Sequence, residues 1–168
     1  MSRDRPKQGC TTHVVLVSSR ADDHASLRKI FRDSPWELQG AFTGSDGLGL
    51  LHCNHRDDIF AVICENNLPD GDWRFLLAEM DKLPVRPNLI VVSHLADERL
   101  WAEVLNLGAF DLLLAAPFEA SEVLRVTESA WLAWQRASLP ETVRRIGPGP
   151  AQSEAGSSAR PYRAIGGI

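Results

Sequence analysis

Residues 62–73 read VICENNLPDGDW, and this stretch decides the fold. An apolar run gives way at Glu65 to polar residues, a Leu-Pro pair and an Asp-Gly turn, after which Trp73 opens a helical pattern. A succession of strand, loop and helix is the repeating unit of α/β proteins. A nearly continuous apolar run is typical of a parallel strand that is covered on both faces.

The same unit recurs along the chain. Strands are predicted at residues 14–17, 37–42, 60–64, 89–92 and 110–114, and the mixed composition of 37–42 indicates an edge strand. Helical patterns follow, beginning near Asp22 or Asp23, Ser45 or Asp46, Asp72, Asp97 and Glu119. Gly108 closes the fourth helix, where a left-handed residue is favourable. The alternation predicts a flavodoxin-like, doubly wound α/β fold with five helices and a five-stranded parallel sheet of order 2-1-3-4-5.

In such sheets, ligands bind where the carboxyl ends of the strands meet the loops that follow. The candidate site therefore consists of the residues at those ends, which are Ser18, Ser19, Glu65, Ser93 and Ala116. Cys64 is expected to be a buried apolar residue rather than a nucleophile. His52, Cys53 and His55 lack a fourth ligand at a recognisable spacing, so we expect no metal site and no cofactor.

The composition is that of a soluble globular protein, with 44% hydrophobic and 24% charged residues. The net charge of -4, without a cluster of Lys and Arg, argues against a nucleic-acid partner. The first apolar run, residues 14–17, is too short for a signal peptide or a membrane span. Three scattered cysteines suit a reducing compartment. We therefore expect a cytoplasmic protein that does not contact membranes.

The chain divides into three parts by composition. Residues 1–12 are a polar N-terminal extension, residues 13–137 form the α/β domain, and residues 138–168 are rich in Pro, Gly and Ser. The last part has little apolar material to bury, so we expect a disordered tail without a further output domain.

Four segments fall in the order and spacing of the response regulator receiver domain of the CheY-like superfamily, which residues 13–137 resemble. The most specific features are the Leu-Pro pair after the third strand and the Pro-Phe pair after the fifth. The segments are Val14–Asp23, Val62–Trp73, Ile90–Asp97 (IVVSHLAD) and Leu107–Leu124 (LGAFDLLLAAPFEASEVL).

The resemblance implies a phosphoryl-accepting pocket at the carboxyl edge of the sheet. In the family, an acidic pair binds Mg²⁺, an Asp accepts the phosphoryl group, and a Ser or Thr and a Lys bind its oxygens. Here the acidic pair aligns with Ser18 and Ser19, the acceptor with Glu65 and the lysine with Ala116. Since Ser93 alone keeps the expected type, we expect a degenerate pseudo-receiver.

The roles of Glu65 and of the pair Asp22 and Asp23 remain open between alternatives. Glu65 either mimics a phosphorylated aspartate by directing its charge toward Ser93, or is a tolerated polar residue. Asp22 and Asp23 either replace the missing metal ligands or cap the first helix, and capping suits their position better. Turn and cap roles likewise suit Asp70 and Asp72.

The function implied by the resemblance is that of a stand-alone domain in two-component (phosphorelay) signal transduction. It would act without phosphorylation and without enzymatic activity, by binding a histidine kinase or another regulator, or by self-association. The expected partner face contains Trp101, Leu113 and Pro117, because Trp is frequent at binding hot spots. Two alternatives remain: a receiver that docks a histidine kinase without phosphotransfer, and a small α/β enzyme or ligand-binding module that uses the same edge.

Overall fold

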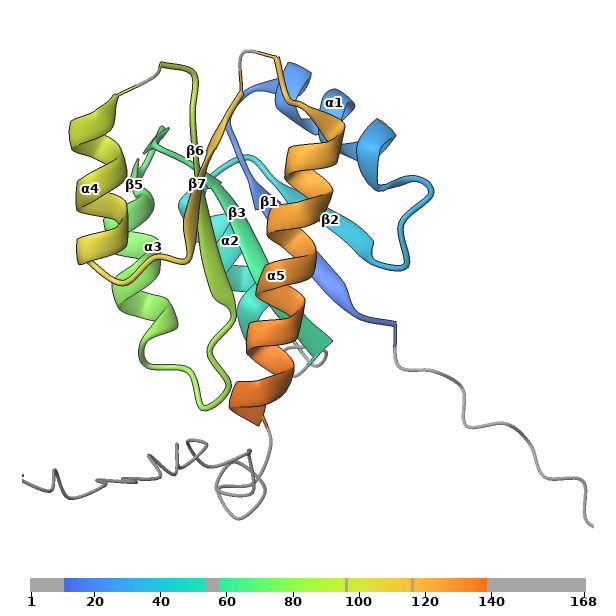
Figure 1. The fold of residues 1–168 in the computed structure, drawn as a ribbon. Coiled ribbons are helices and arrows are strands. Elements are labelled where there is room, and N and C mark those ends of the chain that lie inside the picture. Colours follow the sequence, from blue (N-terminus) through green and yellow to red (C-terminus); the bar gives the residue numbers. More distant parts are fainter. Residues whose placement is uncertain (1–10, 54–57, 96, 116, 139–168) are drawn as a thin grey trace, which may run out of the picture. The chain divides into compact units, whose positions relative to one another are not determined.

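The computed structural model describes residues 11–53, 58–95, 97–115 and 117–138 (Figure 1). Within these ranges, five parallel strands form one sheet in the order β2-β1-β3-β6-β7. This order is the predicted 2-1-3-4-5 arrangement, so the predicted fold class is confirmed. The strands are β1 (His13–Val17), β2 (Glu37–Ala41), β3 (Ile59–Glu65), β6 (Asn88–Ser93) and β7 (Asp111–Leu114). The predicted tail, and most of the N-terminal extension, lie outside the described residues.

Five helices cover the two faces of the sheet. Buried residues of the first and fifth helices pack together against one face, and those of the other three pack against the opposite face (Figure 1). The helices are α1 (Ala21–Phe31), α2 (Gly44–His52), α3 (Trp73–Met80), α4 (Glu98–Asn106) and α5 (Ala120–Ser138). This doubly wound arrangement explains why the strands are apolar throughout rather than alternating.

Strand β3 lies at the centre of the sheet and supplies both hydrophobic cores. Phe60 and Ile63 pack on the side of α1 and α5, whereas Val62 and Cys64 pack on the side of α2, α3 and α4. Side chains of a strand point alternately to its two faces, so a central strand needs apolar residues at nearly every position. Only Glu65, at the carboxyl end of the strand, breaks the run and is partly exposed.

Side-chain caps begin three of the helices. Asp72 accepts hydrogen bonds from the backbone of Arg74 and Phe75 at the start of α3, and Asp97 caps α4, as predicted. Helix α2 is capped by Thr43, so it begins at Gly44 rather than at Ser45 or Asp46.

The prediction that Asp22 or Asp23 caps the first helix is wrong. Helix α1 follows Arg20, which makes no side-chain cap, and Asp22 and Asp23 lie within the first turn. Asp22 is exposed, whereas Asp23 is buried. The first turn is therefore oriented by tertiary contacts of Asp23, which are described below.

A short hairpin joins the central strand to the third helix. Its strands, β4 (Asn67–Leu68) and β5 (Gly71–Asp72), pair antiparallel around Pro69 and Asp70. Asp70 accepts hydrogen bonds from the backbone nitrogens of Gly44 and Ser45 at 2.7 and 2.8 Å, and from the Ser45 hydroxyl at 2.7 Å. The predicted turn residue thus stabilises the N-terminus of α2.

Candidate functional site

The carboxyl edge of the sheet brings together most of the predicted pocket. Ser18 and Ser19 directly follow β1, Glu65 ends β3 and Ser93 ends β6. Since β3 lies between β1 and β6 in the sheet, Glu65 occupies the middle of this edge. The fifth predicted residue, Ala116, lies outside the described residues.

One oxygen of the Glu65 carboxylate lies within hydrogen-bonding distance of three donors. Oε2 accepts hydrogen bonds from the Ser19 backbone nitrogen at 2.9 Å and from Ser19 Oγ at 2.8 Å, and it lies 3.2 Å from Ser18 Oγ. The hydroxyls of Ser18 and Ser19 are therefore placed as donors toward the Glu65 carboxylate. The carboxylate is directed to the side of β1.

Ser93 does not take part in this contact. Its hydroxyl donates to the carbonyl oxygen of Leu95 at 2.9 Å and accepts from the Leu95 backbone nitrogen at 3.2 Å. These bonds fix the start of the loop after β6. Between Glu65 and Ser93, no hydrogen bond is found within the described ranges, so the interaction that phosphomimicry would require is not seen.

Asp23 and His94 complete the site; Asp23 was the less favoured alternative as a ligand there, and His94 was not among the predicted site residues. Asp23 Oδ2 accepts from Ser18 Oγ at 2.8 Å and lies 3.3 Å from His94 Nε2. Asp23 is 3% exposed, and the His94 side chain is 30% exposed. Three segments thus meet here: the first turn of α1, the end of β3 and the loop after β6.

A second buried histidine supports the loop after β1. His24 Nε2 donates to the carbonyl oxygen of Ser18 at 2.8 Å, and its ring stacks on Phe42 with centroids 4.2 Å apart. Gly40 makes this possible, because a Cβ atom there would lie 2.8 Å from His24 Nδ1. His24 therefore positions Ser18 through the backbone. Its spacing from Leu27 and Phe31 places all three on the buried side of α1, a signal that the sequence contains.

The residues present do not fit the magnesium site that the resemblance implies. Mg²⁺ prefers carboxylate and carbonyl oxygens, with several waters. The positions that the resemblance aligns with two carboxylates hold the hydroxyls of Ser18 and Ser19, and both hydroxyls lie within hydrogen-bonding distance of Glu65 Oε2. The carboxylate that does approach Glu65, Asp23, is accompanied by an imidazole, which suits other metals better.

The neighbouring thiol is not a nucleophile. Cys64 is fully buried, and burial raises the pKa of its thiol well above the ordinary value, with Glu65 adding to the effect. A protonated, buried thiol is inert toward electrophiles. In contrast to Cys64, Cys53 is exposed. Nearby, His52 Nδ1 donates to the Leu48 carbonyl oxygen, and His55 lies outside the described residues.

The three residues of the expected partner face differ in exposure. Trp101 is 53% exposed on α4, and Pro117 is exposed as well. Leu113 is wrong, because it is 1% exposed and packs in the core on the side of α1 and α5. Its neighbours Leu112 and Leu114 point to the other side of β7, as the alternation of a strand requires.

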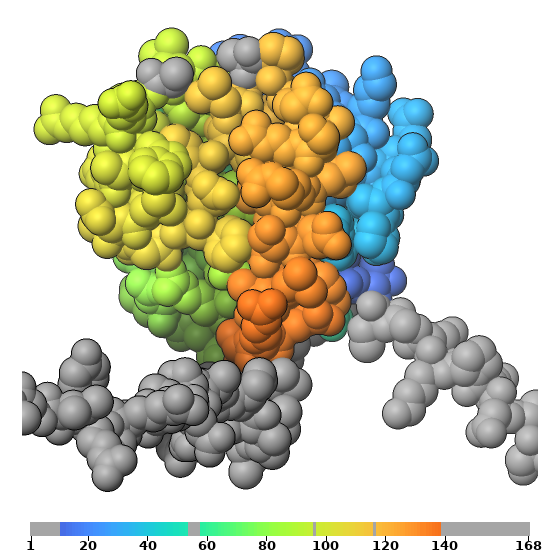
Figure 2. Space-filling view, viewed as in Figure 1, coloured from blue at the N-terminus to red at the C-terminus, as the bar shows by residue number. Residues whose placement is uncertain are grey.

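A groove of about 330 Å³ runs beside Trp101. Its apolar lining comes from Trp101, Leu112 and Leu114, and three carboxylate residues border it. These are Asp97, Glu98 and Glu122. Figure 2 views the face that α4 and α5 share, on which this groove lies.

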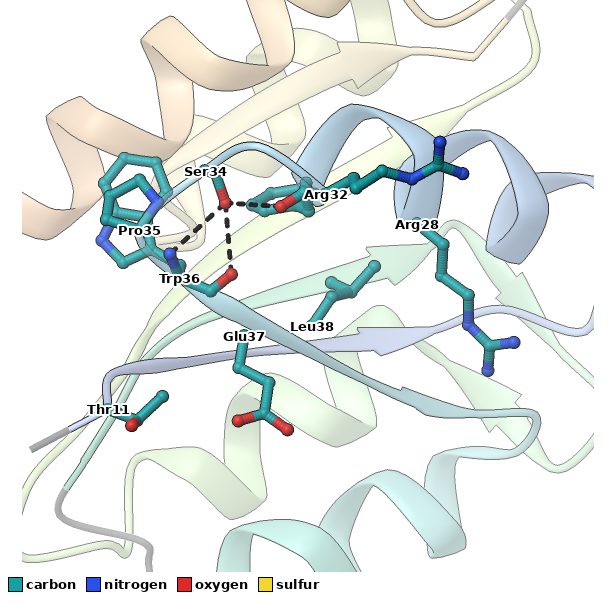
Figure 3. Close-up of a pocket in the computed structure, with 9 residues that line it drawn as sticks. Thr11, Arg28, Arg32, Ser34, Pro35, Trp36, Glu37 and Leu38 are labelled. Atoms are coloured by element: carbon teal, nitrogen blue, oxygen red, sulfur yellow. Dashed lines mark hydrogen bonds between the residues drawn. The ribbon is translucent and has the colours of Figure 1, made fainter.

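A second hollow, of about 400 Å³, lies at the opposite edge, where β1 and β2 begin (Figure 3). Ser34 Oγ donates to the carbonyl oxygen of Phe31 at 2.9 Å and accepts from the Trp36 backbone nitrogen at 3.3 Å, which fixes the turn between α1 and β2. The guanidinium groups of Arg28 and Arg32 point in different directions (Figure 3). The hollow therefore presents no convergent set of polar groups.

None of the helices in the described ranges is long and apolar enough to span a bilayer.

Comparison with solved structures identifies the fold. No protein-family model and no curated protein matches the chain. Among solved structures, the signal receiver domain of an HD domain-containing protein from Pseudomonas fluorescens Pf-5 is 22% identical and matches with a TM-score of 0.67, covering 82% of this chain and all of that one.

Two further structures show the same relationship. A chain of the CheX–CheY–BeF3–Mg²⁺ complex from Borrelia burgdorferi is 21% identical, with 71% of this chain and 89% of that chain covered and a TM-score of 0.64. The Francisella response regulator 1452 receiver domain is 21% identical, with 76% and 99% covered and a TM-score of 0.62. The chain therefore has the fold of the receiver domains of response regulators.

Proposed function

We propose that the chain is a receiver-like signalling domain that acts by binding another protein and does not accept a phosphoryl group. In this proposal it is not an enzyme, and it works in the cytoplasm, where Cys53 and Cys64 remain thiols. The partner is a component of a signalling pathway, such as a histidine kinase or another regulator.

The hydrogen bonding of Glu65 carries the proposal. An attacking carboxylate must approach phosphorus in line, while cations neutralise the charge of the phosphoryl oxygens. Oε2 of Glu65 is instead held by Ser18 and Ser19, which are donors and bring no charge. Ala116 stands where the resemblance calls for a lysine. Removing one preorganised charge partner from such a site costs about 3 kcal/mol of transition-state stabilisation, and here several are missing.

The groove beside Trp101 supports the protein-binding part of the proposal. An aromatic side chain that is half exposed in an apolar groove is a typical anchor for a partner. The bordering carboxylates of Asp97, Glu98 and Glu122 favour a segment that carries Lys or Arg beside its apolar residues. The partner surface that we propose is therefore α4 with β7 and the start of α5.

Phosphorylation is tested directly with a small phosphodonor. The full chain is incubated with acetyl phosphate and Mg²⁺ and examined by intact mass spectrometry, beside a receiver domain that retains the acceptor aspartate. We expect a phosphoryl adduct on the control alone. An acid-labile adduct on this chain, lost in the Glu65→Gln variant, would refute the proposal.

Partner binding is tested by comparing three forms of the chain. Wild type, Trp101→Ala and Leu132→Ala are used to capture proteins from the source cells, and each captured protein is then purified and its affinity measured. Leu132 is 44% exposed on α5 but does not line the groove, so it is the matched control. We expect Trp101→Ala alone to weaken binding, about tenfold or more for an anchor residue. Equal binding by all three forms would exclude this surface.

A further inference from the structure

Three side chains of metal-ligating type converge at the carboxyl edge. The proposed signalling function does not require them to bind a metal. Asp23, Glu65 and His94 each offer one ligand atom, and these atoms all lie within 4.8 Å of one another. They come from α1, β3 and the loop after β6, so the fold itself assembles them. Two carboxylates and one imidazole are a mixed donor set rather than a purely acidic cluster.

The charge balance of this cluster favours a cation. Asp23 is 3% exposed, and a buried carboxylate is stable only when it is paired. Across the described part of the chain, neither Asp23 nor Glu65 forms an ion pair with a Lys or Arg. His94 is the one basic group beside Asp23, so two carboxylates share at most one positive charge.

The hydroxyl between the two carboxylates cannot satisfy both. Ser18 Oγ lies 2.8 Å from Asp23 Oδ2 and 3.2 Å from Glu65 Oε2. A serine hydroxyl has one hydrogen, and an ionised carboxylate only accepts. At any moment, one of these two oxygens therefore faces lone pairs of the hydroxyl instead of a proton. A cation bound by both carboxylates would offset the repulsion between them that this one hydrogen does not relieve.

The spacing also fits first-row metal coordination. His94 Nε2 and Asp23 Oδ2 are 3.3 Å apart, close to the distance of about 3.4 Å between two ligands of a tetrahedral ion with bonds of about 2.1 Å. Glu65 is within reach by rotation of its own side chain, because it is partly exposed at the end of β3. Water can fill the fourth position.

The donor set selects the kind of metal. Imidazole nitrogen suits Zn²⁺, Ni²⁺, Cu²⁺ and Fe²⁺, whereas Mg²⁺ takes oxygen ligands and retains water. A site with His94 as a ligand therefore discriminates against Mg²⁺. This preference differs from the magnesium chemistry that the resemblance implies, and from our expectation that the chain binds no metal.

We propose that Asp23, Glu65 and His94 form a binding site for a divalent transition-metal ion of the Zn²⁺ type. The ion joins α1, β3 and the loop after β6. His94 lies three residues before Asp97, which caps α4 and borders the groove, so the metal site is close in sequence to the proposed partner surface. The proposed metal site does not depend on whether the chain binds a partner protein.

The test is a calorimetric titration of the full chain with Zn²⁺ alone, in a Cys10→Ser, Cys53→Ser background in which the buried Cys64 is the one remaining thiol. We expect one saturable site, weakened about tenfold or more by His94→Ala and by Asp23→Asn. Two control variants, Asp22→Asn and His52→Ala, should bind as the parent does. Asp22 is an exposed carboxylate beside Asp23, and His52 is an exposed imidazole at the end of α2.

Because Asp23 is buried, the decisive variant is His94→Ala, with folding checked by circular dichroism. Co²⁺ supplies a second measurement: nitrogen and oxygen ligands give weak visible bands, whereas a thiolate ligand gives an intense charge-transfer band in the near ultraviolet. We expect weak visible bands that His94→Ala abolishes. The proposal is overturned by the absence of saturable Zn²⁺ binding, by unchanged affinity in folded His94→Ala, or by a thiolate band.

Discussion

The hydroxyl of Ser18 and the buried carboxylate of Asp23 are joined by a hydrogen bond of 2.8 Å that ties the end of β1 to the first turn of α1. Ser18 is 1% exposed and Asp23 is 3% exposed, so water does not replace this contact. Ser18 therefore has a structural role in this chain.

We predict that Ser18→Ala lowers the free energy of unfolding by about 1–3 kcal/mol, because a buried carboxylate loses a donor. Urea unfolding followed by circular dichroism measures the change. Ser19→Ala is the control: Ser19 is exposed, and its backbone nitrogen still donates to Glu65. A loss in Ser19→Ala as large as that in Ser18→Ala would contradict this account.

Two glycines of α2 should respond in opposite directions to the same substitution. A Cβ atom at Gly47 would lie 2.6 Å from Val17 Cγ2, whereas one at Gly49 would meet nothing within 4 Å. We expect Gly47→Ala to destabilise the protein by about 1–3 kcal/mol through overpacking. Gly49→Ala should stabilise it by about 0.5–1 kcal/mol, because alanine favours the helix. Thermal unfolding of both variants tests the pair, and a change of the same sign in both would contradict the helix placement.

Two tryptophans distinguish core from surface. Trp73 is fully buried at the start of α3, and Trp101 is 53% exposed. Trp73→Ala should cost about 3–5 kcal/mol of unfolding free energy, whereas Trp101→Ala should change it by about 0.5 kcal/mol or less. Chemical denaturation of the two variants provides the measurement. A large loss in Trp101→Ala would mean that the residue supports the fold rather than a partner.

The fold was predictable because its strands are marked by composition. Runs such as Phe60–Cys64 are apolar at every position, which only a sheet covered on both faces requires. Short spacing between the runs then limits the connections to right-handed crossovers. The edge position of β2 was predicted from its mixed composition. An edge strand is less covered than a central one, and only three of the five β2 residues are half-buried or buried.

The site was less predictable, because the decisive contacts depend on orientation. An Asp in the first turn of a helix is as suitable for capping as for burial, so the sequence did not separate Asp22 from Asp23. Their difference arises from the rotation of α1 about its axis, which Leu27 and Phe31 set by packing. His94 follows its strand directly, and nothing in the local pattern indicates that its ring turns toward α1.

Leu113 was misplaced for a similar reason. Consecutive leucines at 112–114 do not reveal which of them faces the core. The pairing of β7 with β6 decides this, since Leu113 lies opposite Val92 and both pack on the side of α1 and α5. A shift of the register by one residue would exchange the buried and exposed leucines.

The two described cysteines should differ in reactivity. Burial raises the pKa of the Cys64 thiol above its ordinary value, and the thiolate is the reactive form. Cys53 is exposed at the end of α2. We expect iodoacetamide to label Cys53 in the native protein and Cys64 only after unfolding in urea, as read by peptide mass spectrometry. Rapid native labelling of Cys64 would show that β3 is more accessible than its burial indicates.

Asp70 should make the stability of the protein depend on pH in the acid range. The Ser45 hydroxyl, followed by the backbone nitrogens of Gly44 and Ser45, lowers the pKa of Asp70 from 3.8 to about 2. Because the pKa is lower in the folded state, ionised Asp70 stabilises the fold fully above pH 3.8, and this contribution is lost as the pH falls toward 2.

The variant Asp70→Ala removes this interaction and should cost about 1 kcal/mol near neutral pH, as for the loss of a helix cap. The difference between wild type and variant should shrink as the pH falls from 3.8 to about 2, since wild-type Asp70 becomes protonated over that range. Urea unfolding at a series of pH values measures the difference. A difference that stays constant through this range would mean that the carboxylate charge contributes nothing to the start of α2.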